Sequence, residues 1–400
     1  MSRFPAVSPP GARRESAVST SDPQGAIERR HAARHLLVHP LTCAEFDRDI
    51  FALIRRHGQE LDRWFTQRLG YRLHIDTDTA RLFKSGVVPE HRPLRTTTGR
   101  ALQPRECVLL ALALASTAAG PAVISLRDLV NEIRSAAAEA DIDLVGDATE
   151  RRAIVSVLRW MIANGLAAEL HDRVDAYAED SNADAVLRMR PDRIALLPLP
   201  ALVGAADAEA LLDRAERRSP LRQWMRGRLV EDPVLYREDL DDNEWTELRR
   251  RLGEEGRILA EMFDLALESR AEGVAAIDRD GELTDRRFPT TGTEGHAALL
   301  LIAELGQTDH QPTPLARVND MVAELAHTHA KRWSNDLVTA PERLARQVVA
   351  LLCELRLAHV DEATSMLRLL PAAARFLAVD KPPPLPNGGR GAQAEQGELW

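Results

Sequence analysis

Two segments of the chain share one order of apolar and polar positions. In each segment, apolar residues first recur at the spacing of helices, and two short stretches then alternate between apolar and polar residues. The first segment, residues 103–197, predicts three helices followed by a two-stranded hairpin. The second, residues 293–370, predicts the same order. Three helices with a two-stranded wing are typical of a winged helix-turn-helix, so the pattern predicts tandem winged-helix domains.

Capping residues mark the helix boundaries of the first segment. Ser125 followed by Asp128 is a capping-box pattern for the second helix. The third helix is expected from Thr149 to Asn164, with Gly165 at its exit. An apolar stripe along this helix predicts its core face, and its other side carries three candidate DNA-contact residues: Arg151, Arg152 and Arg159.

The two segments also agree residue by residue at a constant offset. The matched pairs are Arg152 with Arg343, Val157 with Val348, Met161 with Leu352 and Leu166 with Leu357. The agreement breaks where Gly165 meets Arg356. Because a left-handed helix exit favours glycine, we expect the third helix of the second segment to end in a different way.

The chain before the first segment predicts a helix followed by a hairpin. Residues Tyr71–Ile75 and Ala80–Phe83 alternate on either side of a turn at residues 76–78. A basic stretch interrupted by prolines and a glycine then runs to residue 105. It predicts an exposed linker with four further candidate DNA-contact residues: Arg92, Arg95, Arg100 and Arg105.

Opposed charge runs lie between the two segments. A basic run spans residues 214–228 and an acidic run spans 231–247, a pattern typical of solvated helix faces. Farther along, Val274–Ile277 and Glu282–Thr284 enclose Asp280-Gly281, which predicts a hairpin with its turn at that dipeptide.

These patterns divide the chain into six parts. We expect a disordered leader (1–30), N-terminal helices and a β-hairpin with the basic linker (31–100), a first winged-helix domain (101–200), a helical middle segment with a hairpin (201–290), a second winged-helix domain (291–380) and a disordered tail (381–400). The expected fold class is mainly α with small β wings, an α+β fold.

Composition narrows the function. Aromatic residues make up only 4% of the chain, and its many unbranched side chains favour helices. The net charge of −9 argues against a uniformly basic nucleic-acid surface, so any DNA contact must use local patches. Cys43, Cys107 and Cys353 are far apart and are expected to be buried thiols. Without a secretory signal or a membrane-length apolar run, the chain is expected in the cytoplasm.

The common signatures of enzymes are missing from the sequence. It contains no phosphate-binding loop, nucleophile elbow, zinc-binding helix or dinucleotide fingerprint. His327 and His329 are two positions apart on a predicted helix, which separates their rings too widely for one metal. The acidic cluster of residues 239–244 is expected to be a solvated turn. We therefore expect no catalytic residue, no metal and no cofactor.

Scattered motifs carry a resemblance to a known family. They include His39-Pro-Leu41, Leu69-Gly-Tyr-Arg-Leu73, Leu158-Arg-Trp-Met161, Leu283-Thr-Asp285 and Phe288-Pro289. In combination, over about residues 31–379, they resemble the KITE-type subunits, similar to MukE and MksE, of the condensin-like Wadjet (Jet) anti-plasmid systems. The resemblance implies tandem winged helices, a homodimer and binding to a kleisin-like subunit. It also implies that an SMC-like ATPase and a nuclease, as separate subunits, hydrolyse ATP and cleave DNA.

Two other functions compete with a scaffold role. A free-standing winged-helix transcription regulator would read a DNA groove with a basic third helix. An enzyme without a recognisable motif, such as a nuclease, is the other alternative. For the scaffold we expect only weak, sequence-independent DNA binding, because the chain as a whole is acidic.

Overall fold

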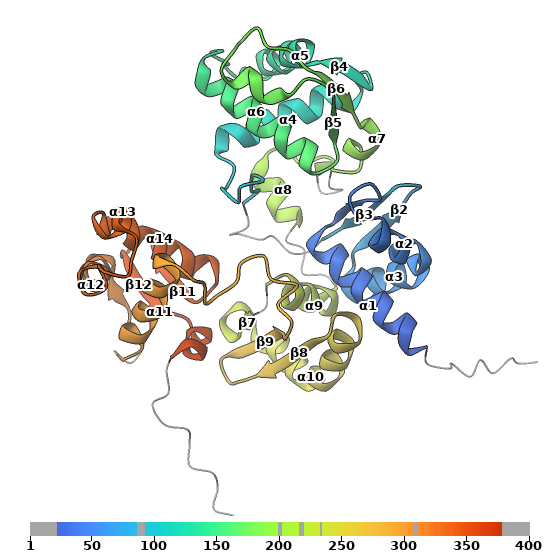
Figure 1. Ribbon diagram of the computed structural model, residues 1–400. Helices are drawn as coiled ribbons and strands as arrows, with labels where there is room; N and C mark the ends of the chain where they lie inside the picture. Colours follow the sequence, from blue (N-terminus) through green and yellow to red (C-terminus); the bar gives the residue numbers. More distant parts are fainter. Residues whose placement is uncertain are drawn as a thin grey trace, which may run out of the picture. The chain divides into compact units, whose positions relative to one another are not determined.

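Helices and small antiparallel sheets build the protein. The computed structural model describes residues 22–85, 93–198, 202–215, 220–232, 234–307 and 311–377. These residues form four three-stranded antiparallel sheets among the helices, which confirms the mixed α+β class (Figure 1). In every sheet the strand that comes last in the chain lies in the middle. The chain divides into two compact units, Met1–Leu283 and Thr284–Trp400.

Residues 23–83, here called module 1, form the first sheet and its helices. The elements are α1 (Pro23–Val38), β1 (Leu41–Cys43), α2 (Arg48–Arg56), α3 (Gly58–Trp64), the π-helical η1 (Phe65–Leu69), β2 (Arg72–Ile75) and β3 (Thr79–Phe83). The hairpin of β2 and β3 is confirmed, with Leu73 opposite Leu82. Asp47 starts α2 by accepting a hydrogen bond from the Ile50 amide at 2.9 Å.

Residues 104–194, module 2, repeat this order. The elements are α4 (Pro104–Ala118), β4 (Val123–Ser125), α5 (Leu126–Glu139), α6 (Ala148–Ala163), β5 (Ala167–His171), the 3-10 helix η2 (Val174–Ala178), β6 (Val186–Met189) and α7 (Pro191–Ile194). The Ser125 side chain caps α5 by accepting from the Asp128 amide at 3.0 Å. The predicted second and third helices and the predicted hairpin are confirmed; the short edge strand β4 was not foreseen.

Residues 221–278, module 3, follow the single helix α8 (Ala208–Ala215). The elements are α9 (Leu221–Glu231), β7 (Val234–Tyr236), the 3-10 helix η4 (Arg237–Asp239), α10 (Asp242–Phe263), β8 (Leu265–Ser269) and β9 (Gly273–Asp278). The predicted hairpin around Asp280-Gly281 is wrong, because β9 pairs backward with β8. β8 follows the 22-residue helix α10 almost immediately. In the sequence, the apolar residues of β8 therefore look like a continuation of that helix.

Residues 293–376, module 4, make up the second unit. The elements are α11 (Thr293–Gly306), β10 (Thr313–Pro314), α12 (Leu315–Thr328), α13 (Asn335–Val338), α14 (Pro341–Glu354), β11 (Ala358–Asp361), β12 (Met366–Leu369) and the 3-10 helix η5 (Pro371–Phe376). The three predicted helices and two predicted strands are present, and the predicted second helix is divided between α12 and a loop.

The third helices of modules 2 and 4 end in the same conformation, contrary to expectation. Gly165 has φ +73° and Arg356, at the matched position, has φ +52°. The Gly165 amide donates to the Ile162 carbonyl at 3.0 Å, and the Arg356 amide donates to the Cys353 carbonyl at 2.9 Å. The prediction of a different exit is wrong because the hydrogen bonds of the turn hold a non-glycine residue in the left-handed region.

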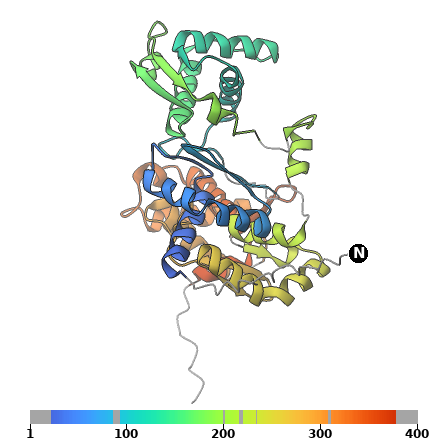
Figure 2. The same ribbon diagram turned by 90° about the vertical axis from the view of Figure 1, so that its right-hand side faces the viewer.

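Buried residues of these elements form three hydrophobic cores. Module 2 and module 4 each have a core of their own. Modules 1 and 3, far apart in sequence, share one core and lie side by side (Figures 1 and 2). The Phe65 and Phe263 rings meet within it, with centroids 6.1 Å apart.

Candidate partner and nucleic-acid interface

The third helix of module 2, α6, is the element that would enter a DNA groove in a winged-helix regulator. Its inner face is buried, and Arg152 and Arg159 project from its outer face. The segment between β5 and β6 folds back so that η2 packs on α6. Val174 and Tyr177 anchor η2 by lying buried in the core of module 2. The segment between β5 and β6 therefore packs beside α6, while the side chains of Arg152 and Arg159 stay 58% and 54% exposed.

The same segment also brings carboxylates to the arginines of α6. Asp175 accepts from Arg159 Nε at 2.5 Å, and Glu179 accepts from Arg152 Nε at 3.3 Å. Hydrogen bonding to Asp175 raises the pKa of Arg159. Arg151 is half-buried and donates to the Gly146 carbonyl at 3.4 Å. All three predicted DNA-contact residues of this helix thus have partners within the protein.

The predicted linker arginines lie apart from that helix. Arg92 falls outside the described residues. Arg95 forms an isolated β-bridge with Ala101 and donates from its side chain to the Gly99 carbonyl at 3.1 Å. A small turn at residues 96–99 therefore holds this part of the basic stretch before α4 begins.

Arg100 and Arg105 are tied to module 2 by buried carboxylates. Arg100 makes a two-pronged contact with Glu106, at 2.8 and 2.6 Å, and its hydrogen bond lowers the pKa of Glu106 to about 2. Arg105 donates to the Asp143 carbonyl and lies 3.6 Å from Glu150. Both carboxylates are buried and both guanidinium groups remain partly exposed. Their contact with DNA stays a prediction.

Modules 1 and 3 form an internal pair with reciprocal contacts. The first helix of each packs against the third helix of the other: α1 on α10, and α9 on η1. Arg34 on α1 donates to the Phe263 carbonyl at the end of α10, at 2.6 Å. In the opposite direction, Arg226 on α9 donates to the Arg68 carbonyl near the end of η1, at 3.2 Å. Such reciprocity is what a twofold-related interface produces.

The sheets of the two modules support this relation. Arg72 pairs with Phe83 in module 1, and Ala266 pairs with Ile277 in module 3. Adding 194 to each residue number of the first pair gives the second pair. Gly70 and Asp264, which follow the third helices of the two modules, both have a left-handed backbone conformation and differ by the same offset. Modules 1 and 3 are therefore two versions of one fold.

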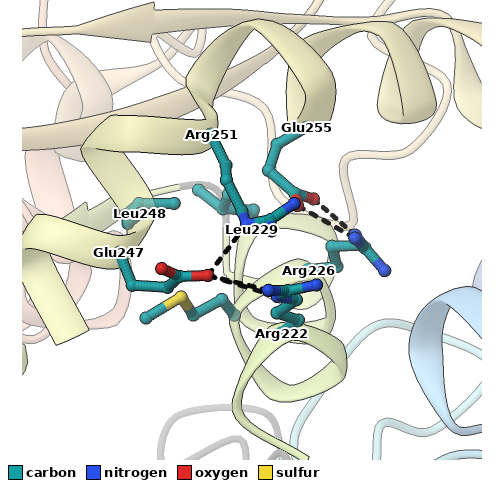
Figure 3. Close-up of a pocket in the computed structure, with 8 residues that line it drawn as sticks. Arg222, Arg226, Leu229, Glu247, Leu248, Arg251 and Glu255 are labelled. Carbon is teal, nitrogen blue, oxygen red and sulfur yellow. Dashed lines mark hydrogen bonds and ion pairs between the residues drawn. The ribbon is translucent and has the colours of Figure 1, made fainter.

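A hollow between α9 and α10 contains a buried ion pair (Figure 3). Arg226 binds Glu255 through both Nε and Nη2, the second at 2.9 Å, and both side chains are buried. Arg222 and Arg251 lie nearer the surface and share Glu247. The expectation that residues 214–228 form a solvated face is wrong at Arg226, because its charge is matched inside the module pair.

A second buried arginine joins modules 1 and 2. Arg193 on α7 is only 1% exposed. It donates to Glu45 at 2.6 Å, to Asp78 at 3.0 Å and to the Gly165 carbonyl at 2.8 Å. Hydrogen bonds from Arg190, and then from Arg193, hold the pKa of Asp78 at about 2. The end of α6 is thereby fastened to the loops of module 1.

A model of the family described as "Protein of unknown function (DUF2398)" matches residues 33–379. The chain belongs to this family. The match begins within α1 and runs past the end of module 4. The DUF2398 region of this chain therefore includes elements of all four modules. No curated protein matches the chain.

Within the ranges that the structure describes, no three His, Cys, Asp or Glu side chains gather in a metal-binding group. Asp241 caps α10 by accepting from the Glu244 amide at 2.8 Å, which explains part of the acidic cluster of residues 239–244. His329 ends α12 and stacks on Trp333, with ring centroids 5.2 Å apart.

The three cysteines of this DUF2398 member differ in burial. Cys43 is buried, and burial raises the pKa of its thiol. Cys353 is half-buried, whereas Cys107 is exposed on α4, so the expectation of three buried thiols is wrong. Several apolar residues on the outer side of α4 are exposed to solvent.

Among the described helices, none has the length and apolar content needed to cross a lipid bilayer.

Proposed function

We propose that this DUF2398 protein is a non-catalytic, KITE-type scaffold subunit of a bacterial SMC complex of the Wadjet kind. In this proposal it acts in the cytoplasm as a dimer, binds a kleisin-like subunit and supports loop extrusion and plasmid restriction by an SMC-like ATPase and a nuclease. The proposal takes each module as a winged helix, and the strand order supports it, because the last strand of each sheet lies in the middle.

The internal pair of modules 1 and 3 is the observation that carries the proposal. In these modules the first and third helices are used to bind another module of the same fold, through a shared core and two buried arginines. Winged helices whose helices bind protein are suited to a scaffold. The resemblance of the scattered motifs to KITE subunits agrees with this use.

A transcription regulator is the alternative, and the third helices argue against it. In module 2, η2 packs on α6, and Glu179 and Asp175 pair with its exposed arginines Arg152 and Arg159. In module 4, α14 offers Arg343 beside Glu342, and Arg343 is paired with Asp336 at 3.3 Å. A groove-reading helix needs basic and polar side chains free to reach base edges.

The purified protein should neither hydrolyse ATP nor cut DNA. The assay is release of phosphate from ATP and nicking of supercoiled plasmid, each with magnesium and with manganese. Cleavage that survives purification and is lost in the Asp241→Asn, Asp242→Asn double variant would contradict the scaffold proposal and favour a nuclease. Tight binding to one duplex but not to an unrelated one, persisting at high salt, would favour the regulator.

A further inference from the structure

Five arginines of module 1 lie exposed on consecutive elements. Arg48 and Arg55 are on α2, Arg63 is on α3, Arg68 is on η1 and Arg72 is on β2. Within the part of the chain that the structure describes, none of these five guanidinium groups makes an ion pair. Arg72 lies over the Phe83 ring, 4.1 Å from its centroid, and remains exposed.

The carboxylates near these arginines do not neutralise them. Residues 48–72 contain six arginines and three acidic residues, in a chain with a net charge of −9. Glu60 is engaged by Arg29 at 3.4 Å and lies 3.5 Å from His57. Asp62 on α3 accepts from the Thr66 hydroxyl of η1 at 3.3 Å. Residues 48–72 therefore carry a local excess of three positive charges on an acidic protein.

The corresponding regions of modules 2 and 3 differ from that of module 1 in contacts and in charge. In module 2 the connection between β5 and β6, residues 172–185, brings η2 onto α6. In module 1 the connection between β2 and β3 is only the turn at 76–78, too short to reach the third helix. In module 3 the matching residues, 242–266, contain seven acidic residues and four arginines, so that region has an excess of negative charge.

The chemistry of the surface fits a phosphate backbone. A guanidinium group can donate two parallel hydrogen bonds to one phosphate and stays charged at any physiological pH. The second and third helices and the first wing strand are also the parts of a winged helix that contact duplex DNA. Gln223 donates to the Thr66 and Gln67 carbonyls at 3.1 Å, which engages the far end of the third helix and leaves its first half open.

We propose that α2, α3, η1 and β2 of module 1 form a phosphate-contacting surface for double-stranded DNA. The proposal rests on the proposed function in taking duplex DNA as the polymer on which the complex acts. Contacts made by Arg55 and Arg63 to phosphates would be independent of sequence and would weaken with salt, because binding releases counterions from the duplex.

The test compares two double charge reversals in the full-length protein. Arg55→Glu with Arg63→Glu removes the proposed contacts. Arg152→Glu with Arg159→Glu is the matched control, since it changes the net charge equally at two exposed arginines that are already paired with Glu179 and Asp175. Fluorescence anisotropy on two unrelated duplexes, over a salt series, gives the affinity and the slope of log affinity against log salt.

Loss of two phosphate contacts should make that slope shallower by about 1.8, and the affinity at low salt should fall at least about tenfold. The control should change the slope by less than half as much. An unchanged slope for the Arg55 and Arg63 variant, or equal losses in both variants, would overturn the proposal. Circular dichroism checks folding, and Arg55→Gln with Arg63→Gln repeats the test without adding negative charge.

The same variants separate this inference from the proposed function. If wild-type protein assembles with the products of adjacent genes and the Arg55 and Arg63 variant assembles equally well but binds DNA normally, only the DNA surface is wrong. If wild-type protein does not assemble at all, the scaffold proposal fails whatever the anisotropy shows.

Discussion

Replacing Arg226 with alanine should lower the free energy of unfolding of the Met1–Leu283 unit by about 3–5 kcal/mol. The substitution leaves the Glu255 carboxylate buried without its counter-charge, since the two side chains are 7% and 6% exposed. It also removes the donor to the Arg68 carbonyl, which joins module 3 to module 1. An uncompensated buried charge costs far more than a surface ion pair contributes, because burial deprives it of hydration.

Arg222→Ala is the matched control, because this arginine is on the same helix and also pairs with a glutamate of α10 (Figure 3). Its side chain is 49% exposed, so its loss should cost less than about 1 kcal/mol. Urea and thermal unfolding followed by circular dichroism measure both variants. Equal stabilities of the two variants would show that Arg226 does not hold the module pair together.

Replacing Gly165 with alanine should destabilise the same unit by about 2–4 kcal/mol. One part of the effect is backbone strain, since Gly165 has φ +73° and a residue with a Cβ atom resists this conformation. The other part is crowding. The added Cβ would lie 2.9 Å from Arg193 Nη1 and from Phe46 Cε2, and 3.0 Å from Cys43 Sγ. Arg193 cannot move aside without leaving Glu45 and Asp78.

Gly281→Ala separates backbone strain from crowding. Gly281 has φ +69°, and an added Cβ there would meet no atom within 4 Å. This control should therefore show only the strain, about 1 kcal/mol. If Gly165→Ala is no more destabilising than Gly281→Ala in the same denaturation experiment, the close contact between the end of α6 and module 1 is not rigid.

The helices and hairpin of module 2 were predictable because local signals mark them. Ser125 caps α5, and Asp147 caps α6 by accepting from the Glu150 amide at 2.8 Å. These residues act within a few positions of themselves, so their effect can be read from neighbouring letters. The β2–β3 hairpin was predictable for the same reason, since its alternation and its turn are contiguous.

Features that depend on distant residues were not predictable. Nothing near Arg226 in the sequence distinguishes it from the exposed arginines of the same run, because its partner Glu255 is 29 positions away. The packing of η2 on α6 depends on how a loop folds back, so Arg152 and Arg159 looked like free cations. The kinship of modules 1 and 3 was also hidden, since strand register and helix exits reveal it while few residues match.

The candidate DNA surface shows the same limit. The sequence directed attention to the densest basic stretch, which contains Arg100 and Arg105. Both lie beside buried glutamates in the first turns of α4 and α6, Glu106 and Glu150. Arg55 and Arg63 stand in a stretch where acidic residues alternate with the arginines, and the burial and pairing of their neighbours sets them apart.

Co-expression with the products of the adjacent genes tests the scaffold assignment most directly. The tagged chain is purified at physiological salt, and the mass of the eluted species is measured by light scattering. The account predicts a stable complex in which this protein, as a dimer, accompanies a kleisin-like subunit and an SMC-like ATPase. A well-behaved monomer that retains none of these proteins would contradict it.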